Sequence, residues 1–112
     1  MKKANSVAVI ESDKIKINYI KKALDNFGEK ILVTKFEDSV EKGIKTIEKF
    51  QPDVVFLDIS MKDENGKTLL DRIDKFSFDI IILDNFEFYR LEAKDSQKSG
   101  FLFKRIDISE FI

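Results

Sequence analysis

A continuous apolar run that ends at a single carboxylate is the feature that most constrains how this chain folds. Val54 to Leu57 are all apolar, Asp58 follows directly, and a polar turn with Asn65 and Gly66 comes next. A short run rich in β-branched and aromatic residues is typical of a strand buried on both faces, as in parallel sheets. Because ligands gather at the carboxyl ends of such strands, we interpret Asp58 as a carboxylate displayed at the edge of a sheet.

Strand-like and helix-like segments alternate along the chain. Short apolar runs predict strands over residues 7–10, 31–36, 54–57, 80–83 and 101–103. Apolar residues at helical spacing predict a helix after Asp13, a second after Asp38, and a third from Leu69 to Phe76. Residues 86–99 predict only a marginal fourth helix because their apolar stripe is weak, and a fifth helix is almost absent at residues 106–112. The alternation predicts an α/β fold with a five-stranded parallel sheet and helices on both faces.

Composition limits the chemistry that this chain can perform. Its 112 residues fit one domain, and its net charge of -1 provides no basic field for nucleic acid. It contains no His and no Cys, so any bound metal must be held by oxygen, which favours Mg²⁺. No apolar run approaches the roughly 20 residues that cross a bilayer, and no signal peptide is visible. We therefore expect a cytoplasmic protein that does not contact a membrane.

Charged residues follow four of the predicted strands. Glu11 and Asp13 follow the first strand, Asp58 the third, Asp84 the fourth and Lys104 the fifth. If these strands are neighbours, the acids and the lysine meet at one edge of the sheet. The alternative is that the acids only cap helices or lie solvated in loops, and we favour it for Asp13 or Asp84 taken alone. For Asp58 we favour a functional role, because it interrupts the most buried strand.

The order and spacing of these motifs resemble the receiver domain of two-component response regulators over essentially the whole chain. The resemblance rests on four stretches: Pro52-Asp53, Leu57-Asp58-Ile59 followed by Gly66, Glu87 to Ala93 as the beginning of a fourth helix, and Phe101-Leu102-Phe103-Lys104. It implies a flavodoxin-like, doubly wound sheet with the strand order 2-1-3-4-5.

The resemblance also implies a role for each matching position. Asp58 accepts the phosphoryl group, Glu11 helps to organise Mg²⁺, and Ser60 binds that ion through its backbone carbonyl. Lys104 pairs with the phosphoryl oxygens, and Phe101 is the aromatic switch residue. The partner is a histidine kinase or phosphotransfer protein, and the domain is a phosphoacceptor rather than an enzyme. Mg²⁺ and an ammonium are needed because a carboxylate attacks an anionic phosphoryl donor poorly unless charge is neutralised.

Three positions depart from the family pattern. Ser12 replaces an acid that directly binds Mg²⁺, and Asp13 is the candidate substitute one residue later. Asp84 stands where the family has Ser or Thr, and a carboxylate there repels a phosphoryl group. Arg105 replaces a proline that usually follows a cis bond, so we expect a trans or rebuilt turn.

These departures leave two outcomes open for the pocket. In the first, Asp84 joins Asp58 and Glu11 as an oxygen ligand of a metal ion. In the second, the crowded carboxylates raise one another's pKa and the pocket binds metal and phosphate poorly. The chain is accordingly either a Mg²⁺-dependent phosphoacceptor or a pseudo-receiver that acts as an interaction or dimerisation module. A small-ligand domain is disfavoured because no phosphate-binding loop follows the first strand, and a hydrolase because no substrate cleft is evident.

The nearly absent fifth helix has its own consequence. In this architecture, that helix and the first one cover the same face of the sheet. Without it, part of the apolar strand surface lacks a cover, and such patches favour association. We expect a homodimer, a swapped helix, or a longer regulator that continues after Ile112.

Overall fold

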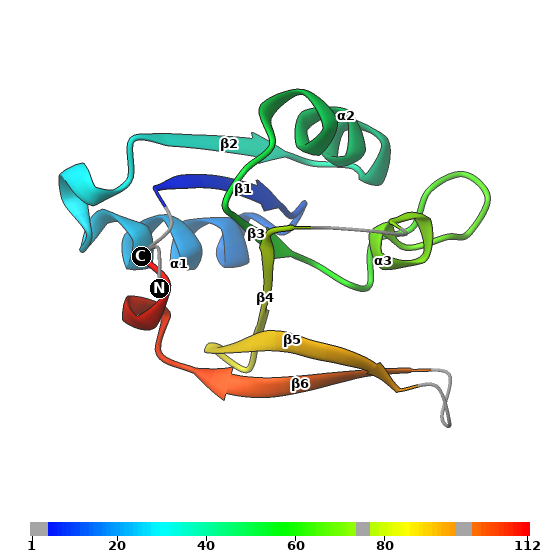
Figure 1. Ribbon diagram of the computed structural model, residues 1–112. Coiled ribbons are helices and arrows are strands. Elements are labelled where there is room, and N and C mark those ends of the chain that lie inside the picture. Colours follow the sequence, from blue (N-terminus) through cyan, green and yellow to red (C-terminus); the bar gives the residue numbers. More distant parts are fainter. Residues whose placement is uncertain (1–4, 74–76, 96–99) are drawn as a thin grey trace.

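A single mixed sheet forms the centre of the computed structural model, which describes residues 5–73, 77–95 and 100–112. Within these residues the sheet has six strands in the order β2-β1-β3-β4-β5-β6 (Figure 1). The strands are β1 (Ser6–Ile10), β2 (Val33–Glu37), β3 (Val54–Leu57), β4 (Asp79–Asp84), β5 (Glu87–Asp95) and β6 (Gly100–Ile106). The first four are parallel, whereas β5 is antiparallel to both β4 and β6.

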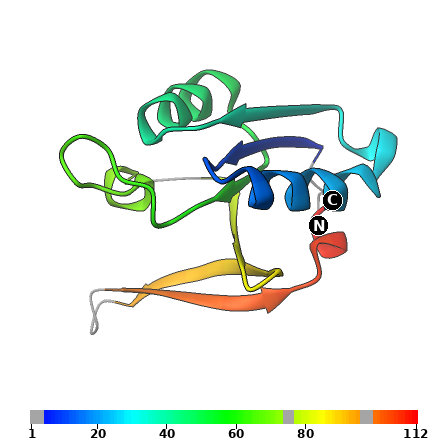
Figure 2. The same ribbon diagram turned by 180° about the vertical axis from the view of Figure 1, so that it is seen from behind.

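Helices cover both faces of the parallel part of the sheet. The helices are α1 (Lys14–Asp25), α2 (Val40–Phe50) and α3 (Leu69–Arg72), with 3-10 turns η1 (Gly28–Lys30) and η2 (Ile108–Glu110). α1 and η2 lie on one side, and α2 and α3 lie on the other (Figure 2). Asp13 caps α1 as predicted, whereas Ser39 rather than Asp38 caps α2. None of the described helices is long and apolar enough to cross a membrane.

The two faces of the central strands supply two hydrophobic clusters. Val9 and Phe56 belong to the cluster under α1 and η2, and Ile10 and Leu57 belong to the cluster under α2 and α3. All four residues of β3 are buried. Because both faces are covered, the strands consist of continuous apolar runs rather than alternating ones. The prediction of an α/β fold with buried parallel strands is confirmed, including the order 2-1-3-4.

The predicted fourth helix is wrong, because residues 87–95 form the strand β5. A two-residue turn joins β4 to β5, and its residues Asn85 and Phe86 have φ angles of 52° and 60°. Two successive positive φ values are the geometry of the hairpin turns that match the twist of paired strands. Phe88 packs against the α1 cluster and Leu91 against the α2–α3 cluster, so residues three positions apart lie on opposite faces, as in a strand and not in a helix. Predicted helical residues 96–99 lie outside the described residues.

The hairpin also changes the position of the last strand. The fifth predicted strand is β6, which pairs with β5 rather than with β4. The all-parallel order 2-1-3-4-5 is therefore corrected to four parallel strands followed by two antiparallel ones. The reason is that β5 occupies the edge of β4 that the predicted arrangement leaves for the last strand.

The predictions for the third and fifth helices have different outcomes. α3 ends at Arg72, and predicted residue Phe76 lies outside the described residues. As expected, the fifth helix is reduced, here to the turn η2. Ile108 and Ile112 are only 7% and 2% exposed and belong to the α1 cluster, so the end of the chain covers part of the face that we expected to lie open.

Candidate functional site

Glu11 and Asp58 lie side by side at the carboxyl edge of the sheet. β1 and β3 are neighbouring parallel strands in which Ile10 pairs with Leu57, so the residue that follows each strand comes to the same place. The Asp58 N–H donates to the Ile10 carbonyl at 3.0 Å, and the Glu11 N–H donates to the Glu37 carbonyl at 3.0 Å. Glu11 is only 5% exposed, and Asp58 is half-buried. The ladder of the sheet therefore fixes the backbone of both acids.

The two carboxyl groups differ in pKa, and their surroundings favour the protonated form of Glu11 and the charged form of Asp58. Burial and a hydrogen bond with Asp58 raise the pKa of Glu11 from 4.5 to about 7. The Ser12 and Asp13 N–H groups oppose this rise by donating to Glu11 Oε2 at 3.0 and 3.3 Å. Burial also acts to raise the pKa of Asp58, but hydrogen bonds from Glu11 and Ser60 outweigh it and lower that pKa below its ordinary value. Asp58 is thus the charged member of the pair.

Ser60 orients the Asp58 carboxylate. Its hydroxyl and its backbone N–H donate to Asp58 Oδ1 at 2.6 and 2.8 Å. Two donors on one oxygen hold the carboxylate in a single direction and favour its charged form. The role of the Ser60 carbonyl toward a metal ion stays a prediction.

The other two predicted acids are placed differently. Asp13 Oδ1 accepts from the N–H groups of Ile15 and Lys16 at 2.8 and 3.3 Å, which is the cap of α1. Asp84 is exposed at the end of β4, beside the turn to β5. Because β4 is parallel to β3, Asp84 lies at the same edge of the sheet as Asp58. These contacts of Asp13 are those of a helix cap, which is the alternative that we favoured for Asp13 taken alone.

The acids present a minimal set of ligands for Mg²⁺. Among the described residues, no group of three or more acidic, His or Cys side chains is arranged to hold a metal ion. Mg²⁺ in phosphate-handling sites is commonly bound by only one or two carboxylates and keeps several waters. The pair of Glu11 and Asp58 fits that requirement once Glu11 has lost its proton.

Lys104 does not join the acids, contrary to the expectation from the sequence. It pairs with Arg90, Arg90 pairs with Ile81, and Ile81 pairs with Phe56. Lys104 is therefore at the same height in the sheet as Phe56 of β3, but β4 and β5 lie between the strands that carry the two residues. Neighbouring strands are about 4.8 Å apart, so about 14 Å separates the two backbones. A lysine side chain is far shorter than that, and the inserted strand β5 is the reason for the separation.

Phe101, the predicted switch residue, lies on β6 with Lys104. It pairs with Lys94 at the end of the hairpin that is remote from the acids, and it packs against the α2–α3 cluster. Its role as a switch stays a prediction.

Lys16 is a cation near Asp58 that the sequence analysis did not single out. After burial and the hydrogen bonds described above, its positive charge also contributes to the lowered pKa of Asp58. It lies in the first turn of α1 and is half-buried. Lysines are frequent along this helix, and no local pattern distinguishes Lys16 from the others. Only the packing of α1 on the sheet brings it to the acids.

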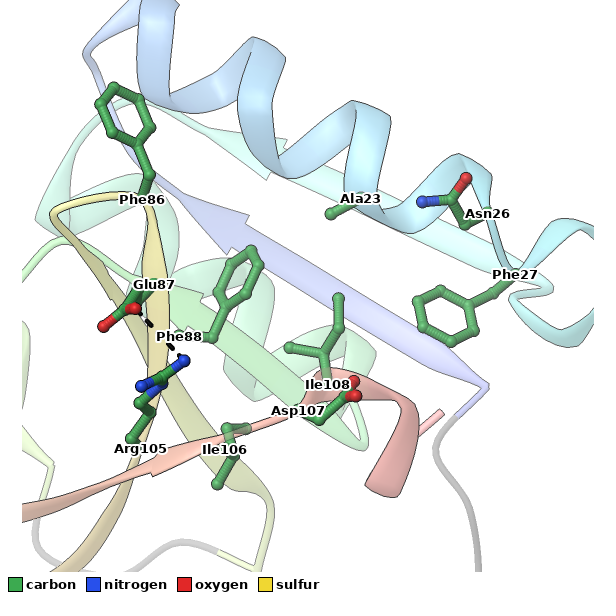
Figure 3. Close-up of a pocket in the computed structure, with 10 residues that line it drawn as sticks. All are labelled: Ala23, Asn26, Phe27, Phe86, Glu87, Phe88, Arg105, Ile106, Asp107 and Ile108. Carbon is green, nitrogen blue, oxygen red and sulfur yellow. Dashed lines mark ion pairs between the residues drawn. The ribbon is translucent and has the colours of Figure 1, made fainter.

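An open groove lies between α1, the β5–β6 hairpin and η2, and has a volume of about 460 Å³ (Figure 3). Phe27, Phe88 and Ile106 contribute apolar surface to it, and Arg105 forms an ion pair with Glu87 at 3.3 Å. The acids at the edge of the sheet do not line this groove. Asp58 and Glu11 therefore act at a different place from this groove.

Comparisons with known proteins bear on the family of this chain. The family model of the response regulator receiver domain matches residues 7–112. An uncharacterized response regulatory protein of Vibrio cholerae serotype O1 is 26% identical over 103 residues, which cover 91% of this chain and 43% of that protein. This chain thus spans less than half the length of that relative. No solved structure matched the chain significantly.

Proposed function

The chain belongs to the response regulator receiver domain family, and on this premise we propose that Asp58 accepts a phosphoryl group from a histidine kinase or a phosphotransfer protein. The observation that carries the proposal is the placement of a charged, oriented carboxylate at the end of the buried strand β3, beside the buried acid Glu11. Carboxyl ends of parallel strands are where such folds act on their ligands.

The transfer replaces one bond to phosphorus with another. A carboxylate oxygen of Asp58 attacks the phosphorus of a phosphohistidine, and the bond between phosphorus and nitrogen breaks. The imidazole keeps the electron pair and takes a proton from water, and an acyl phosphate is left on Asp58. Ser60 contributes by holding the carboxylate in one direction before the attack, since positioning supplies much of the catalysis in phosphoryl transfer.

Glu11 and Asp58 are the residues that would hold Mg²⁺ at this site. Bound there, the ion would neutralise negative charge between the carboxylates and the incoming phosphoryl group. Glu11 must be deprotonated before it becomes a ligand, and its pKa is raised to about 7.

A phosphorylation-independent pseudo-receiver is the second candidate function. The position of Lys104, three strands from β3, and the strand β5 in place of a fourth helix favour it. Asp84 at the position of a Ser or Thr favours it as well. Such a domain would act as a protein-interaction or dimerisation module.

Phosphorylation of the purified chain by acetyl phosphate distinguishes the two candidates. We expect intact-protein mass spectrometry to show one added phosphoryl group in the presence of Mg²⁺. Asp58→Asn should abolish the modification, because the amide is not a nucleophile of this kind. Asp84→Asn is the matched control at the same edge and should retain it. A wild-type chain that stays unmodified would favour the pseudo-receiver, and a modified Asp58→Asn variant would place the acceptor elsewhere.

A further inference from the structure

The position of Lys104 leaves the proposed phosphoacceptor without the ammonium group that we expected to pair with the phosphoryl oxygens. An acyl phosphate adds up to about two negative charges to a site that already holds Glu11 and Asp58. Asp84, at the same edge, adds a further carboxylate. A positive side chain within reach of Asp58 is therefore needed to offset this charge.

The face of α1 that carries Lys16 is attached to the turn between β4 and β5. Tyr19, three residues after Lys16 and on the same side of the helix, donates its hydroxyl to the Phe86 carbonyl at 2.8 Å. The rings of Tyr19 and Phe86 are 5.2 Å apart between centroids. At the beginning of α1, the Lys16 backbone N–H donates to Oδ1 of the capping residue Asp13. These contacts hold the first turns of α1 over the carboxyl end of β4.

Lys16 and the end of β4 line one depression of about 350 Å³. Leu83 and Asp84 are among its other lining residues. Asp58 and Leu83 each lie two residues beyond the paired residues Phe56 and Ile81 on neighbouring parallel strands. Extending this register by two residues places Asp58 about one strand spacing, 4.8 Å, from Leu83. The depression lined by Lys16 and Leu83 thus lies at the end of the strand next to the one that Asp58 follows.

The alternation along β3 also directs Asp58 toward Lys16. Phe56 packs into the cluster under α1, and a residue two positions further along an extended chain points to the same side. Among the described residues, no ion pair engages the Lys16 ammonium. Lys16, a half-buried residue on the helix that covers this face, thus offers an ammonium that no ion pair engages within the described part of the chain.

We infer that Lys16, on α1, is the cation that serves the Asp58 carboxylate and its phosphoryl group in place of Lys104. The inference rests on the proposed function for the phosphorylated state. Lys16 offsets the charge of Asp84 as well, since both line the same depression. The positive charge of Lys16 also acts to lower the pKa of the Asp58 carboxyl group.

The test compares the rate of phosphorylation by acetyl phosphate in single variants. The carboxylate oxygen attacks phosphorus, the bond to the acetyl oxygen breaks, and acetate leaves with the electron pair. We expect Lys16→Ala to slow the reaction about tenfold or more, and Lys16→Arg to recover part of the rate. Lys22→Ala, in the last turn of the same helix, is the matched control and should leave the rate unchanged. A large loss in Lys104→Ala together with no loss in Lys16→Ala would overturn the inference.

A double-mutant cycle separates this inference from the proposed function. Urea unfolding of the wild type, Lys16→Ala, Asp58→Asn and the double variant should give non-additive changes in stability, whereas the matching cycle with Lys22→Ala should be additive. This measurement needs no phosphorylation. If the wild-type chain is not phosphorylated, the proposed function fails, and the cycle still decides whether Lys16 acts on Asp58. Additive changes in the Lys16 cycle would overturn the assignment.

Discussion

Glu11→Gln should remove a pH dependence of stability that this chain otherwise shows between about pH 5 and pH 8. Glu11 is 5% exposed, and its pKa is raised from 4.5 to about 7 by burial and by its hydrogen bond with Asp58. A carboxyl group with a raised pKa binds its proton more tightly in the folded state than in the unfolded chain. Its contribution to stability is therefore complete below pH 4.5 and is lost as the pH rises through about 7.

The pKa shift sets the size of the effect. A rise of this size corresponds to about 3 kcal/mol of unfolding free energy. Because Ser12 and Asp13 beside Glu11 are exposed, water screens part of the interaction, and we expect about 1–2 kcal/mol in practice. The chain has no His and no Cys to titrate in this interval. Asp58, whose pKa is lowered from 3.8, contributes stability that is lost only as the pH falls below that value.

Urea unfolding at several pH values measures the effect. The wild type should lose stability from about pH 5 to pH 8, whereas Glu11→Gln should be nearly flat, because the amide still donates to Asp58 but does not titrate. Asp58→Asn should reduce the slope without abolishing it, since burial of Glu11 remains. Glu29→Gln, in the exposed turn η1, is the control and should keep the wild-type slope. Equal slopes in the wild type and Glu11→Gln would refute the raised pKa of Glu11.

Substitutions at three further positions test the packing, a turn and a helix cap, each by the midpoint of thermal unfolding. Gly43→Ala places a Cβ atom 2.7 Å from Ile10 Cδ1, so we expect a net loss of about 1 kcal/mol despite the gain in helix propensity; a raised midpoint would contradict this. Asn85→Ala puts a Cβ-bearing residue without a polar side chain at a φ of 52° and should cost about 1 kcal/mol, whereas Asn85→Gly should not. Thr68→Ala removes the acceptor for the Asp71 N–H at 3.2 Å and should cost about 1 kcal/mol; an unchanged midpoint would show that α3 needs no cap.

The part of the site that could be predicted from the sequence is the part built on consecutive parallel strands. The strands that precede Glu11 and Asp58 are continuous apolar runs, and such runs indicate burial on both faces whatever the rest of the chain does. The alternation of strands and helices predicted a parallel sheet, and the strand order that makes β1 and β3 neighbours was implied by the family resemblance. The pairing of Ile10 with Leu57 brings the next residue of each strand to one edge. Local pattern together with the resemblance was sufficient for this result.

Residues 86–95 show where local pattern was insufficient. Their aromatic and charged residues give neither a clear helical stripe nor a clean alternation, so both interpretations fit the sequence. β4 decides between them, because it has an edge with unpaired backbone groups that β5 pairs from Asp84 back to Ile81. The two-residue turn at Asn85 and Phe86 places β5 next to β4 directly after β4 ends.

The sequence by itself determined that this is an α/β chain of buried parallel strands, with Asp58 and Glu11 at their ends. This was possible because burial and strand order are expressed in short apolar runs and in the order of segments. Only the tertiary structure decided which cation meets these acids. Lys104 is carried three strands away by the β4–β5–β6 hairpins, and Lys16 is brought near by the packing of α1. Contacts between distant segments depend on which edges and faces pair, and no local pattern records that choice.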